Sequence, residues 1–328
     1  MRVLITGITG FVGHHLSELF IKEGYDVFGT AFTSKDFTSK KVKIFKCDIR
    51  DADNIKNIVS EIKPQQIYHL SAVSYPPDSL INPKITYDTN FYGTMNLFDT
   101  VRELRLDSKI LFVGSADEYG AITEGTPVTE DFPLTPLSPY AVSKTAADLL
   151  SYSYVKRYGM NIVRVRPFNH TGPGQKSIYV CSDFARQIAE IESGVREPVV
   201  YTGNLDIQRD FTDVRDMVLA YKLAIEKGAS GEAYNICSER SYSIRWILDT
   251  LLKFAKLSVE IREDKTKLRP TDITTIRGDC SKFKTATGWK PIMQFEKTLN
   301  DILSYWREKI VGSRQQAVCF LLTAYFYI

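Results

Sequence analysis

The sequence is poor in the residues that build metal centres and disulfide frameworks. Its 328 residues include four histidines and five cysteines, and the cysteines stand far apart with no CxxC pair among them. Zinc sites and disulfide-stabilised scaffolds normally show closely spaced Cys and His residues. We therefore expect neither a bound metal nor a disulfide framework.

Concentrated charge of one sign is missing as well. The chain carries 42 basic and 39 acidic residues, a net charge of +3, and they are spread along it without a block of like charges. Surfaces that bind nucleic acid gather Lys and Arg on one stripe or face. The charge pattern therefore argues against a nucleic-acid partner.

Long apolar runs are also absent. The most apolar stretch, AVCFLLTAYFYI at residues 317–328, is shorter than the roughly 20 residues that a membrane-spanning helix needs. The start, MRVLITG, is too short for the core of a signal peptide. We expect a cytoplasmic protein without a membrane partner. The last helix is expected to end near Arg307–Lys309, and the tail after it could be a strand, a dimer contact or an atypical chain end.

Short apolar runs alternate with amphipathic stretches through the first half of the chain. The runs are rich in Val, Ile and Phe, as buried parallel strands are. This alternation predicts an α/β fold, a Rossmann-like doubly wound parallel sheet with ligands at the carboxyl ends of its strands. The expected strands are Val3–Thr6, Val27–Phe32, Val42–Cys47, Ile67–Ser71, Ile110–Ser115 and Ile162–Val165, and the expected helices are Phe11–Glu23, Ala52–Ile62, Ile85–Leu104 and Tyr140–Tyr158.

After Pro167 the pattern changes to loops marked by Gly and Pro, with scattered helices. One strand-like run, Ala233–Cys237, is expected to return to the main sheet. The second part is therefore predicted to be a smaller, discontinuous C-terminal substrate-binding lobe. We expect residues 1–167 and 211–238 to form a dinucleotide-binding domain, 168–210 and 239–310 the lobe, and 311–328 the apolar tail. Helices are expected at Phe184–Ser193, Val214–Lys227, Ile244–Ala255 and Phe295–Arg307.

A glycine-rich turn follows the first expected strand. The segment TGITGFVG spaces Gly7, Gly10 and Gly13 three residues apart, and Phe11 and Val12 open the helix that follows. Glycines at this spacing allow a tight turn, a close approach to a pyrophosphate and close packing of helix on sheet. The helix N-terminus then offers free N–H groups to the phosphates. The turn predicts a dinucleotide site.

The tip of the second expected strand bears on the choice of cofactor. NAD-binding proteins usually place an acid there, about 20 residues on, for the ribose hydroxyls. This chain has none, and Thr33, Ser34 and Lys35 could hold a 2′-phosphate instead. We expect NADPH, with NADH possible; the alternative is a solvated loop without preference. Asp48 and Ile49, after the third strand, are expected to meet the adenine, unless Asp48 is a helix cap.

A second signature lies about 130 residues downstream. Tyr140 and Lys144 in YAVSK are one helical turn apart and share a face. A nearby ammonium favours the phenolate, so we expect Lys144 to lower the tyrosine pKa towards the working range. Ser115 ends an earlier strand and is expected to orient the substrate oxygen. Together with the glycine turn, this triad predicts a nicotinamide-dependent hydride transfer.

At these residues the chain resembles the extended short-chain dehydrogenases/reductases that act on nucleotide sugars. TGITGFVG, Asp48-Ile49, HLSAVS, NFYGTMNL, SADEYG and YAVSK fall, in order, where the motifs of that family fall. The resemblance covers nearly all of residues 1–307. It implies that Leu70, Ala72 and Asn90 belong to the cofactor site.

The second lobe resembles the GDP-mannose 4,6-dehydratase branch, and within it the GDP-4-keto-6-deoxymannose reductases. RPFNHTGPGQ, GNLDIQRDFTDVRD, LRPTD and TGWKP carry this resemblance. It implies that Asn169, Arg209 and Arg269 hold the diphosphate, since guanidinium groups suit phosphate oxygens. It also places Asp272 at the ribose hydroxyls and Val180 in the substrate site. Each arginine could instead form a surface ion pair.

Two adjacent acids bear on the choice between reductase and dehydratase. A dehydratase needs an extra base, and that branch has Glu where this chain has the shorter Asp117. Ser115, Ala116 and Asp183 also depart from the dehydratase pattern. Asp117 is expected among the catalytic residues and, together with Glu118, at the substrate; the alternative is that the two are simply polar turn residues.

The favoured interpretation is reduction of the C4 ketone of GDP-4-keto-6-deoxymannose, with Tyr140 as the proton donor. The product would be GDP-rhamnose or its C4 epimer, GDP-6-deoxytalose. A dehydratase or epimerase, and a dinucleotide-binding sensor or scaffold without activity, stay open as alternatives. Excess apolar residues on the expected helices Ile85–Leu104 and Tyr140–Tyr158 further predict a homodimer through a four-helix bundle, as in relatives.

Overall fold

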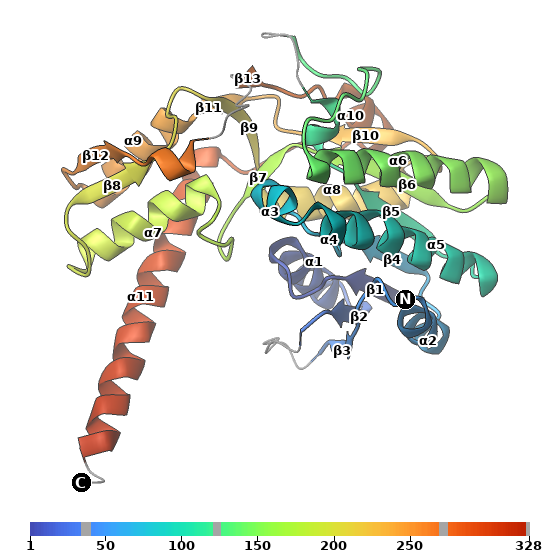
Figure 1. Cartoon of the computed structure of the whole chain (residues 1–328), viewed down its shortest axis with the longest axis horizontal. Coiled ribbons are helices and arrows are strands. Elements are labelled where there is room, and N and C mark those ends of the chain that lie inside the picture. Colours follow the sequence, from blue (N-terminus) through green and yellow to red (C-terminus); the bar gives the residue numbers. More distant parts are fainter. Residues whose placement is uncertain (34–40, 121–125, 269–274, 326–328) are drawn as a thin grey trace.

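The computed structural model describes residues 1–33, 41–120, 126–268 and 275–325, and the side chains of Thr275 and of residues 313–325 lie outside the description. The chain forms a large α/β body and a smaller lobe beside it (Figure 1). The lobe begins with β7 (Asn169–Thr171), which directly follows the carboxyl end of β6 (Ile162–Pro167). The lobe therefore stands at the edge of the sheet where ligands of doubly wound folds bind.

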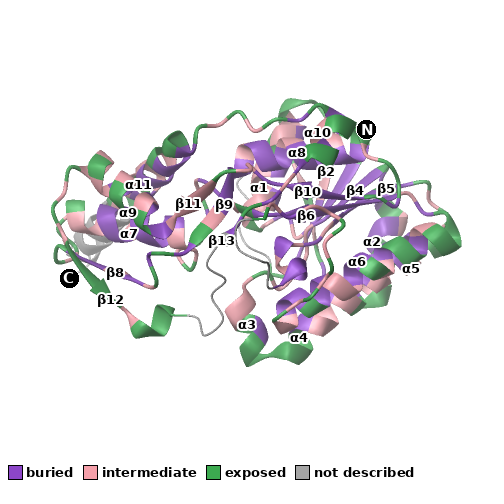
Figure 2. Cartoon of the chain, turned by 90° about the horizontal axis from the view of Figure 1, so that it is seen from above, coloured by how far each residue is buried: buried purple, intermediate pink, exposed green. Residues whose placement is uncertain are grey.

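The body is built on seven strands, all parallel, in the order β10-β6-β5-β4-β1-β2-β3. Figure 2 shows most of these strands buried in the middle of the molecule. The predicted return of Ala233–Cys237 is confirmed, since β10 pairs with β6. The sheet confirms the predicted doubly wound fold. The strands not yet given are β1 (Arg2–Thr6), β2 (Asp26–Ala31), β3 (Lys43–Lys46), β4 (Gln66–His69), β5 (Lys109–Val113) and β10 (Ala233–Ile236).

Both faces of the sheet are covered because both sets of alternating side chains are apolar. Leu4, Ile67 and Ile110 point to one face, and they pack against α2, α5 and α6. Val3 and Leu111, one position away, point to the other, under α1, α8 and α10. The helices are α1 (Phe11–Lys22), α2 (Ala52–Ile62), α5 (Gly93–Glu103), α6 (Pro139–Tyr158), α8 (Val214–Lys227) and α10 (Ser281–Thr287).

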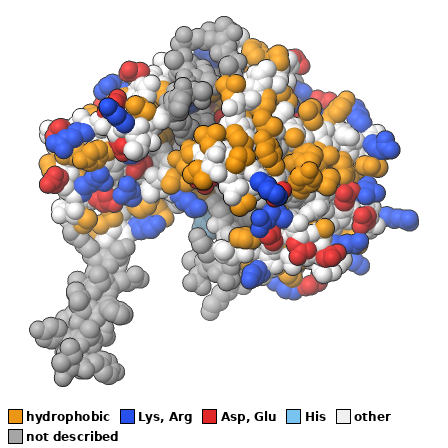
Figure 3. All heavy atoms as spheres, viewed as in Figure 1, with side chains coloured by type: hydrophobic (Ala, Val, Ile, Leu, Met, Phe, Trp, Pro, Cys, Tyr) orange, Lys and Arg blue, Asp and Glu red, His pale blue; other side chains and the backbone are white. Residues whose placement is uncertain are grey.

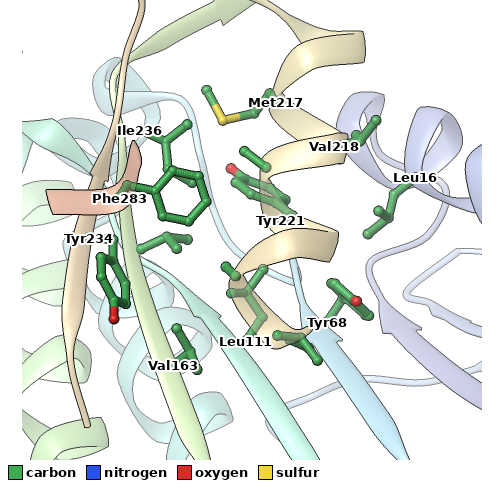
Figure 4. Close-up of a cluster of buried hydrophobic side chains, with 14 of the residues drawn as sticks. Leu16, Tyr68, Leu111, Val163, Met217, Val218, Tyr221, Tyr234, Ile236 and Phe283 are labelled. Atoms are coloured by element: carbon green, nitrogen blue, oxygen red, sulfur yellow. The ribbon is translucent and has the colours of Figure 1, made fainter. Parts of the chain in front are cut away.

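The packing under α8 forms the largest part of the core. Figure 4 shows Tyr221 and Met217 of α8 pointing toward side chains of the strands, and Phe283 of α10 beside Tyr234 of β10. The ring centroids of Phe283 and Tyr234 are 5.7 Å apart in an edge-to-face arrangement. Such aromatic pairs add to the free energy gained from apolar burial.

The expected helix Ile85–Leu104 is present but begins earlier and is interrupted. It starts at Pro83 after the Asn82 cap, whose side chain accepts from the backbone N–H of Ile85 at 3.2 Å. A π-helical turn separates its two α-helical parts. Such turns are frequent at functional sites. The three parts are α4 (Pro83–Tyr87), η1 (Asp88–Tyr92) and α5, and the short α3 (Pro76–Ile81) precedes them.

The lobe has its own apolar core, formed by α7, α9 and α11 with side chains from β8 and β9. Helix α7 begins at Val180, one turn before the predicted Phe184. Two small sheets, β11-β9-β13 with β7 on β9, and β12-β8, complete the lobe. Its remaining elements are α7 (Val180–Glu192), β8 (Val199–Thr202), β9 (Gln208–Asp213), β11 (Ser241–Ser243), α9 (Ile244–Ala255), β12 (Glu260–Glu263), η3 (Lys265–Lys267), β13 (Thr275–Ile276) and α11 (Phe295–Tyr325).

The predicted end of the last helix is wrong. Helix α11 continues from Phe295 to Tyr325, so residues 311–325 do not form a strand. In the polar stretch GSRQQ that follows Val311, the strongest helix-disfavouring residue is Gly312, which costs only about 1 kcal/mol relative to Ala, so the helix can continue through it. Within the described residues, no helix has the length and apolar character needed to cross a membrane.

Candidate active site

The glycine turn adopts the geometry that a pyrophosphate requires. Gly7 has φ +69°, a left-handed conformation that favours glycine, and a Cβ on Gly13 would lie 2.6 Å from the carbonyl oxygen of Ile8. Helix α1 begins at Phe11 without an acidic residue in its first turn and without a side-chain cap on Gly10. Its N-terminal N–H groups and its dipole therefore suit an anion. Val12 packs against the core below.

The tip of β2 carries an exposed Phe32, and Thr33 beside it is exposed too. The guanidinium of Arg50 lies over the Phe32 ring at 5.6 Å. The predicted 2′-phosphate ligands Ser34 and Lys35 lie outside the described residues, so that prediction is untested.

The alternative to an adenine contact was that Asp48 caps helix α2. Asp48 does not cap this helix. Asp51, three residues later, is the cap and accepts from the backbone N–H of Asn54 at 3.0 Å. Asp48 instead binds Arg50 through both carboxylate oxygens, at 2.8 and 2.6 Å. This ion pair lowers the pKa of Asp48. Ile49 is buried.

Asn90, predicted at the cofactor, has its side-chain amide engaged within the protein. Its oxygen accepts from the Val73 N–H at 2.8 Å, and its nitrogen donates to the Val73 carbonyl at 3.1 Å and to Ser143 at 2.9 Å. Asn90 therefore ties the loop after β4 to α6. Leu70 and Ala72, half-buried in this loop, are held beside the glycine turn.

Three of the predicted catalytic residues, Ser115, Tyr140 and Lys144, converge. Tyr140 and Lys144 are both buried on α6, which starts at the Ser138 cap, and a hydrogen bond joins Tyr140 to Ser115. The strand β5 ends at Val113, so Ser115 begins the short helix η2 (Ala116–Tyr119) instead of ending the strand. The Lys144 amine donates to the Val113 carbonyl at 2.8 Å.

The expected effect of Lys144 on Tyr140 is not what the structure shows. Burial, followed by the charge of Asp117, raises the pKa of Tyr140, and the hydrogen bond with Ser115 opposes the rise. Burial lowers the pKa of Lys144 to about 8, and Glu118 opposes that change. The phenol is therefore protonated, which suits a proton donor.

Asp117 and Glu118 have different environments. Asp117 is half-buried and close enough to Tyr140 to affect its pKa. Glu118 is completely buried, where it accepts from the Ser115 N–H at 2.7 Å and lies 3.4 Å from Arg166. The prediction of Glu118 as a substrate ligand is wrong, because its side chain is completely buried and its carboxylate is bound to the Ser115 N–H.

The predicted lobe residues are only partly described. Asn169 is exposed at the start of β7, Val180 is half-buried at the start of α7, and Arg209 is half-buried on β9. One Arg209 nitrogen donates to the Gln208 carbonyl at 2.8 Å. The other predicted ligands, Arg269 and Asp272, lie outside the described residues.

The sequence did not point to one aromatic residue, Tyr179, that lies close enough to Tyr140 to affect its pKa. Tyr179, just before α7, contacts Tyr75 of the loop after β4, with ring centroids 5.6 Å apart. Its hydroxyl lies 3.5 Å from that of Ser74, and its charge would affect Tyr140. Only the position of Tyr179 beside Val180 could have indicated this.

A buried ion cluster beneath the site was missed as well. Arg166 and Arg164 of β6 both pair with Asp148, one turn beyond Lys144 on α6. Arginines at alternate positions of a strand predicted to be buried were the available signal, since buried charges need partners.

A sequence model of the family described as GDP-mannose 4,6 dehydratase matches residues 4–302. The chain belongs to the GDP-mannose 4,6-dehydratase family. The resemblance identified from the sequence motifs is thereby confirmed.

Relatives with different activities are about equally similar in sequence to this chain. The chain is 31% identical to a GDP-6-deoxy-D-mannose reductase of Pseudomonas aeruginosa over 94% of its own length and 98% of the relative. It is 30% identical to GDP-mannose 4,6 dehydratase 1 of Arabidopsis thaliana, over 94% and 92%. The structure of RMD from Pseudomonas aeruginosa complexed with NADPH is 31% identical, with a TM-score of 0.83 over 94% of this chain and 99% of that one.

Proposed function

We propose that the protein is an NADPH-dependent reductase of a GDP-linked 4-keto-6-deoxyhexose, and that its substrate is GDP-4-keto-6-deoxymannose. The observation that carries this proposal is the convergence of Ser115, Tyr140 and Lys144 with one short carboxylate, Asp117, close enough for its charge to affect the phenol. A dehydratase needs a base that reaches C5, and Asp117 is one methylene shorter than the Glu of that branch. The similarity to a GDP-6-deoxy-D-mannose reductase supports the same conclusion.

The residues present fit a dinucleotide. The close packing at Gly13 and the uncapped start of α1 suit its pyrophosphate. When bound, NADPH supplies the hydride for the ketone carbon. The relative of known structure that was solved with NADPH supports this cofactor, and NADH stays possible.

The proposed chemistry of the chain concerns one proton. Tyr140 donates its phenolic proton to the ketone oxygen as the hydride arrives at the carbon, and the phenolate left behind regains a proton from solvent. Its raised pKa keeps the donor protonated before the step. Ser115 orients the substrate oxygen, and Lys144 stabilises the phenolate.

Binding of the distant nucleotide would place the ketone. We propose that Asn169, Arg209 and Arg269 hold the diphosphate, that Asp272 binds the ribose, and that Val180 packs on the substrate. Binding energy from these remote groups then serves to orient the reacting carbon. This assignment goes with the proposed division into a dinucleotide domain (1–167 and 211–238) and a lobe (168–210 and 239–310).

The decisive experiment follows NADPH oxidation spectroscopically. With GDP-4-keto-6-deoxymannose the purified protein should oxidise one NADPH per molecule of sugar, and the product, GDP-rhamnose or GDP-6-deoxytalose, is then identified by NMR. UDP- and dTDP-linked keto sugars serve as controls for the nucleotide.

Dehydratase activity is the second candidate, because Asp117 lies near Tyr140 and several relatives are dehydratases. Such an enzyme would convert GDP-mannose with no net change in cofactor. Turnover of GDP-mannose without turnover of the keto sugar would refute the reductase proposal.

We also propose a homodimer formed by α4, α5 and α6. Figure 3 shows hydrophobic side chains gathered over α3, α4 and α6. On α4, on the π-helical turn η1 and on α6, respectively, Ile85, Tyr92 and Leu149 are 42%, 51% and 55% exposed. Apolar patches of this kind mark protein contacts. Sedimentation should give a dimer for the wild type and a shift towards monomer for Leu149→Glu; a monomeric wild type would refute it.

A further inference from the structure

Glu118 occupies an unusual position for a carboxyl group. Its side chain is completely buried beneath the catalytic serine, and one oxygen, Oε1, accepts the Ser115 N–H at 2.7 Å. In return the Ser115 hydroxyl accepts the backbone N–H of Asp117 at 3.1 Å. This reciprocal pair is a capping box, and it fixes the first turn of η2. The catalytic hydroxyl is thus held by a turn that Glu118 anchors.

The second oxygen of Glu118 has no hydrogen-bond partner among the described residues. The nearest cation is the Nε of Arg166, 3.4 Å away, which itself donates to Asp148 at 3.0 Å. A protonated Glu118 would place an O–H next to the Nε–H donor of Arg166. Burial, and then the charge of Asp148, raise the pKa of Glu118, whereas Arg166 and the Ser115 N–H oppose this rise and favour the ionised carboxylate.

Lys144 is the cation on the catalytic side of this carboxylate. Its amine donates to the Val113 carbonyl at 2.8 Å, and Oε1 of Glu118 lies against the next residue, Gly114. Glu118 raises the pKa of Lys144, and Lys144 in turn opposes the rise that burial causes in the pKa of Glu118. Lys144 also lowers the pKa of His69 on β4. The charged or titratable groups near the pair are Asp117 on η2, Tyr119 on η2, Tyr140 and Asp148 on α6, Arg166 on β6 and His69 on β4.

We propose that Glu118 is a positioning residue of the active site, which fixes the Ser115 turn through Oε1 and supplies the buried negative charge that holds Lys144 in its ammonium form. The inference rests on the proposed reductase activity. It assigns Glu118 no contact with substrate or cofactor. The two roles can be tested separately, because the amide of a glutamine at position 118 can accept the Ser115 N–H but carries no charge.

The test compares Glu118→Gln, Glu118→Ala and a matched control, Glu130→Gln. Glu130 is also a partly buried carboxylate that accepts a backbone N–H at 2.7 Å, but from Asn235 of β10 and not from Ser115. For each variant, kcat and KM with NADPH and GDP-4-keto-6-deoxymannose are measured from pH 6 to 10. Circular dichroism establishes which variants fold.

The ammonium form of Lys144 is present below its pKa and lost above it. In Glu118→Gln the alkaline limb of kcat should therefore move down by about one pH unit, with kcat near that of the wild type at pH 6.5. Glu118→Ala, if folded, should lose about tenfold in kcat at every pH, since it also frees the Ser115 N–H. Superimposed profiles for Glu118→Gln and the wild type, or an equal shift in Glu130→Gln, would overturn the proposal.

A second readout does not depend on the substrate. The Lys144 side chain is titrated by NMR on lysine-labelled protein, with Lys144→Arg used to assign its signal. Its pKa should fall in Glu118→Gln and stay unchanged in Glu130→Gln, and an unchanged value in both variants sinks the proposal. A wild type that leaves the keto sugar untouched would instead refute the proposed function, while this titration still decides the role of Glu118.

Discussion

His69 should make the protein sensitive to acid. The side chain is buried on β4, with Nδ1 at 2.8 Å from the Thr6 hydroxyl and Nε2 at 2.9 Å from that of Thr94. The Thr94 hydroxyl donates to the Asn90 carbonyl at 2.6 Å, so it accepts from Nε2–H. The Thr6 oxygen accepts two backbone N–H groups and donates to Nδ1. These contacts assign a neutral imidazole whose Nδ1 has no room for a proton.

The size of the effect follows from the pKa. Burial, with the charge of Lys144 as a second cause, lowers the pKa of His69 to about 3 from 6.5. Between these values the unfolded chain binds a proton that the folded one does not, so the free energy of unfolding falls as the pH drops. The loss is about 1.4 kcal/mol per pH unit, or about 2.7 kcal/mol at pH 4.5.

The assay is urea unfolding of the wild type, His69→Gln and His14→Gln between pH 7.5 and 4.5. His69→Gln should be less stable at pH 7.5 but should lose about 2.7 kcal/mol less than the wild type on going to pH 4.5. His14, exposed on α1, provides the control, and His14→Gln should follow the wild type. Equal pH dependence in the wild type and His69→Gln would refute the reasoning, whatever their stabilities at pH 7.5.

The other predictions concern the catalytic phenol, the glycine turn and the junction with the lobe. Tyr140→Phe should lower kcat by about 10²–10⁴-fold while NADPH binding, measured by fluorescence, is retained. Gly13→Ala should raise the KM for NADPH at least tenfold, because its Cβ would lie 2.6 Å from the Ile8 carbonyl oxygen; an unchanged KM contradicts this. Asp216→Ala should cost about 2–5 kcal/mol in urea unfolding, since the carboxylate accepts the N–H groups of Ile292 and Met293 at 3.0 and 2.9 Å. A loss below 1 kcal/mol would show that those groups find other partners.

The main sheet could be predicted because each strand depends on local signals. Apolar runs of four to six residues between helical patterns are sufficient to place β1, β4 and β5. Tyr140 and Lys144 could be paired for the same reason, since residues four apart on a helix share a face whatever surrounds them. Spacing alone also indicated the glycine turn.

What the sequence could not provide depends on contacts between distant segments. Arg164 and Arg166 alternate in β6 as an exposed face would, yet both sides of this sheet are covered. Their partner Asp148 is 16 and 18 residues away, and nothing local identifies it. The expected pKa shift of Tyr140 was wrong for a related reason. The prediction considered only the neighbouring Lys144 ammonium and left out burial, which is the largest cause of the raised pKa of Tyr140.

The adjacent acids Asp117 and Glu118 have different roles although they belong to one short turn. In η2 successive side chains point in different directions, so Asp117 is half-buried whereas Glu118 is completely buried. The longer carboxylate is used inside, where its length lets it return to the Ser115 N–H as the third residue of a capping box. The shorter one remains beside Tyr140, where it disfavours the phenolate. In this arrangement the phenol of Tyr140 stays protonated, and the nearby base, Asp117, has a short side chain. Both features favour giving a proton to a ketone over removing one from a neighbouring carbon.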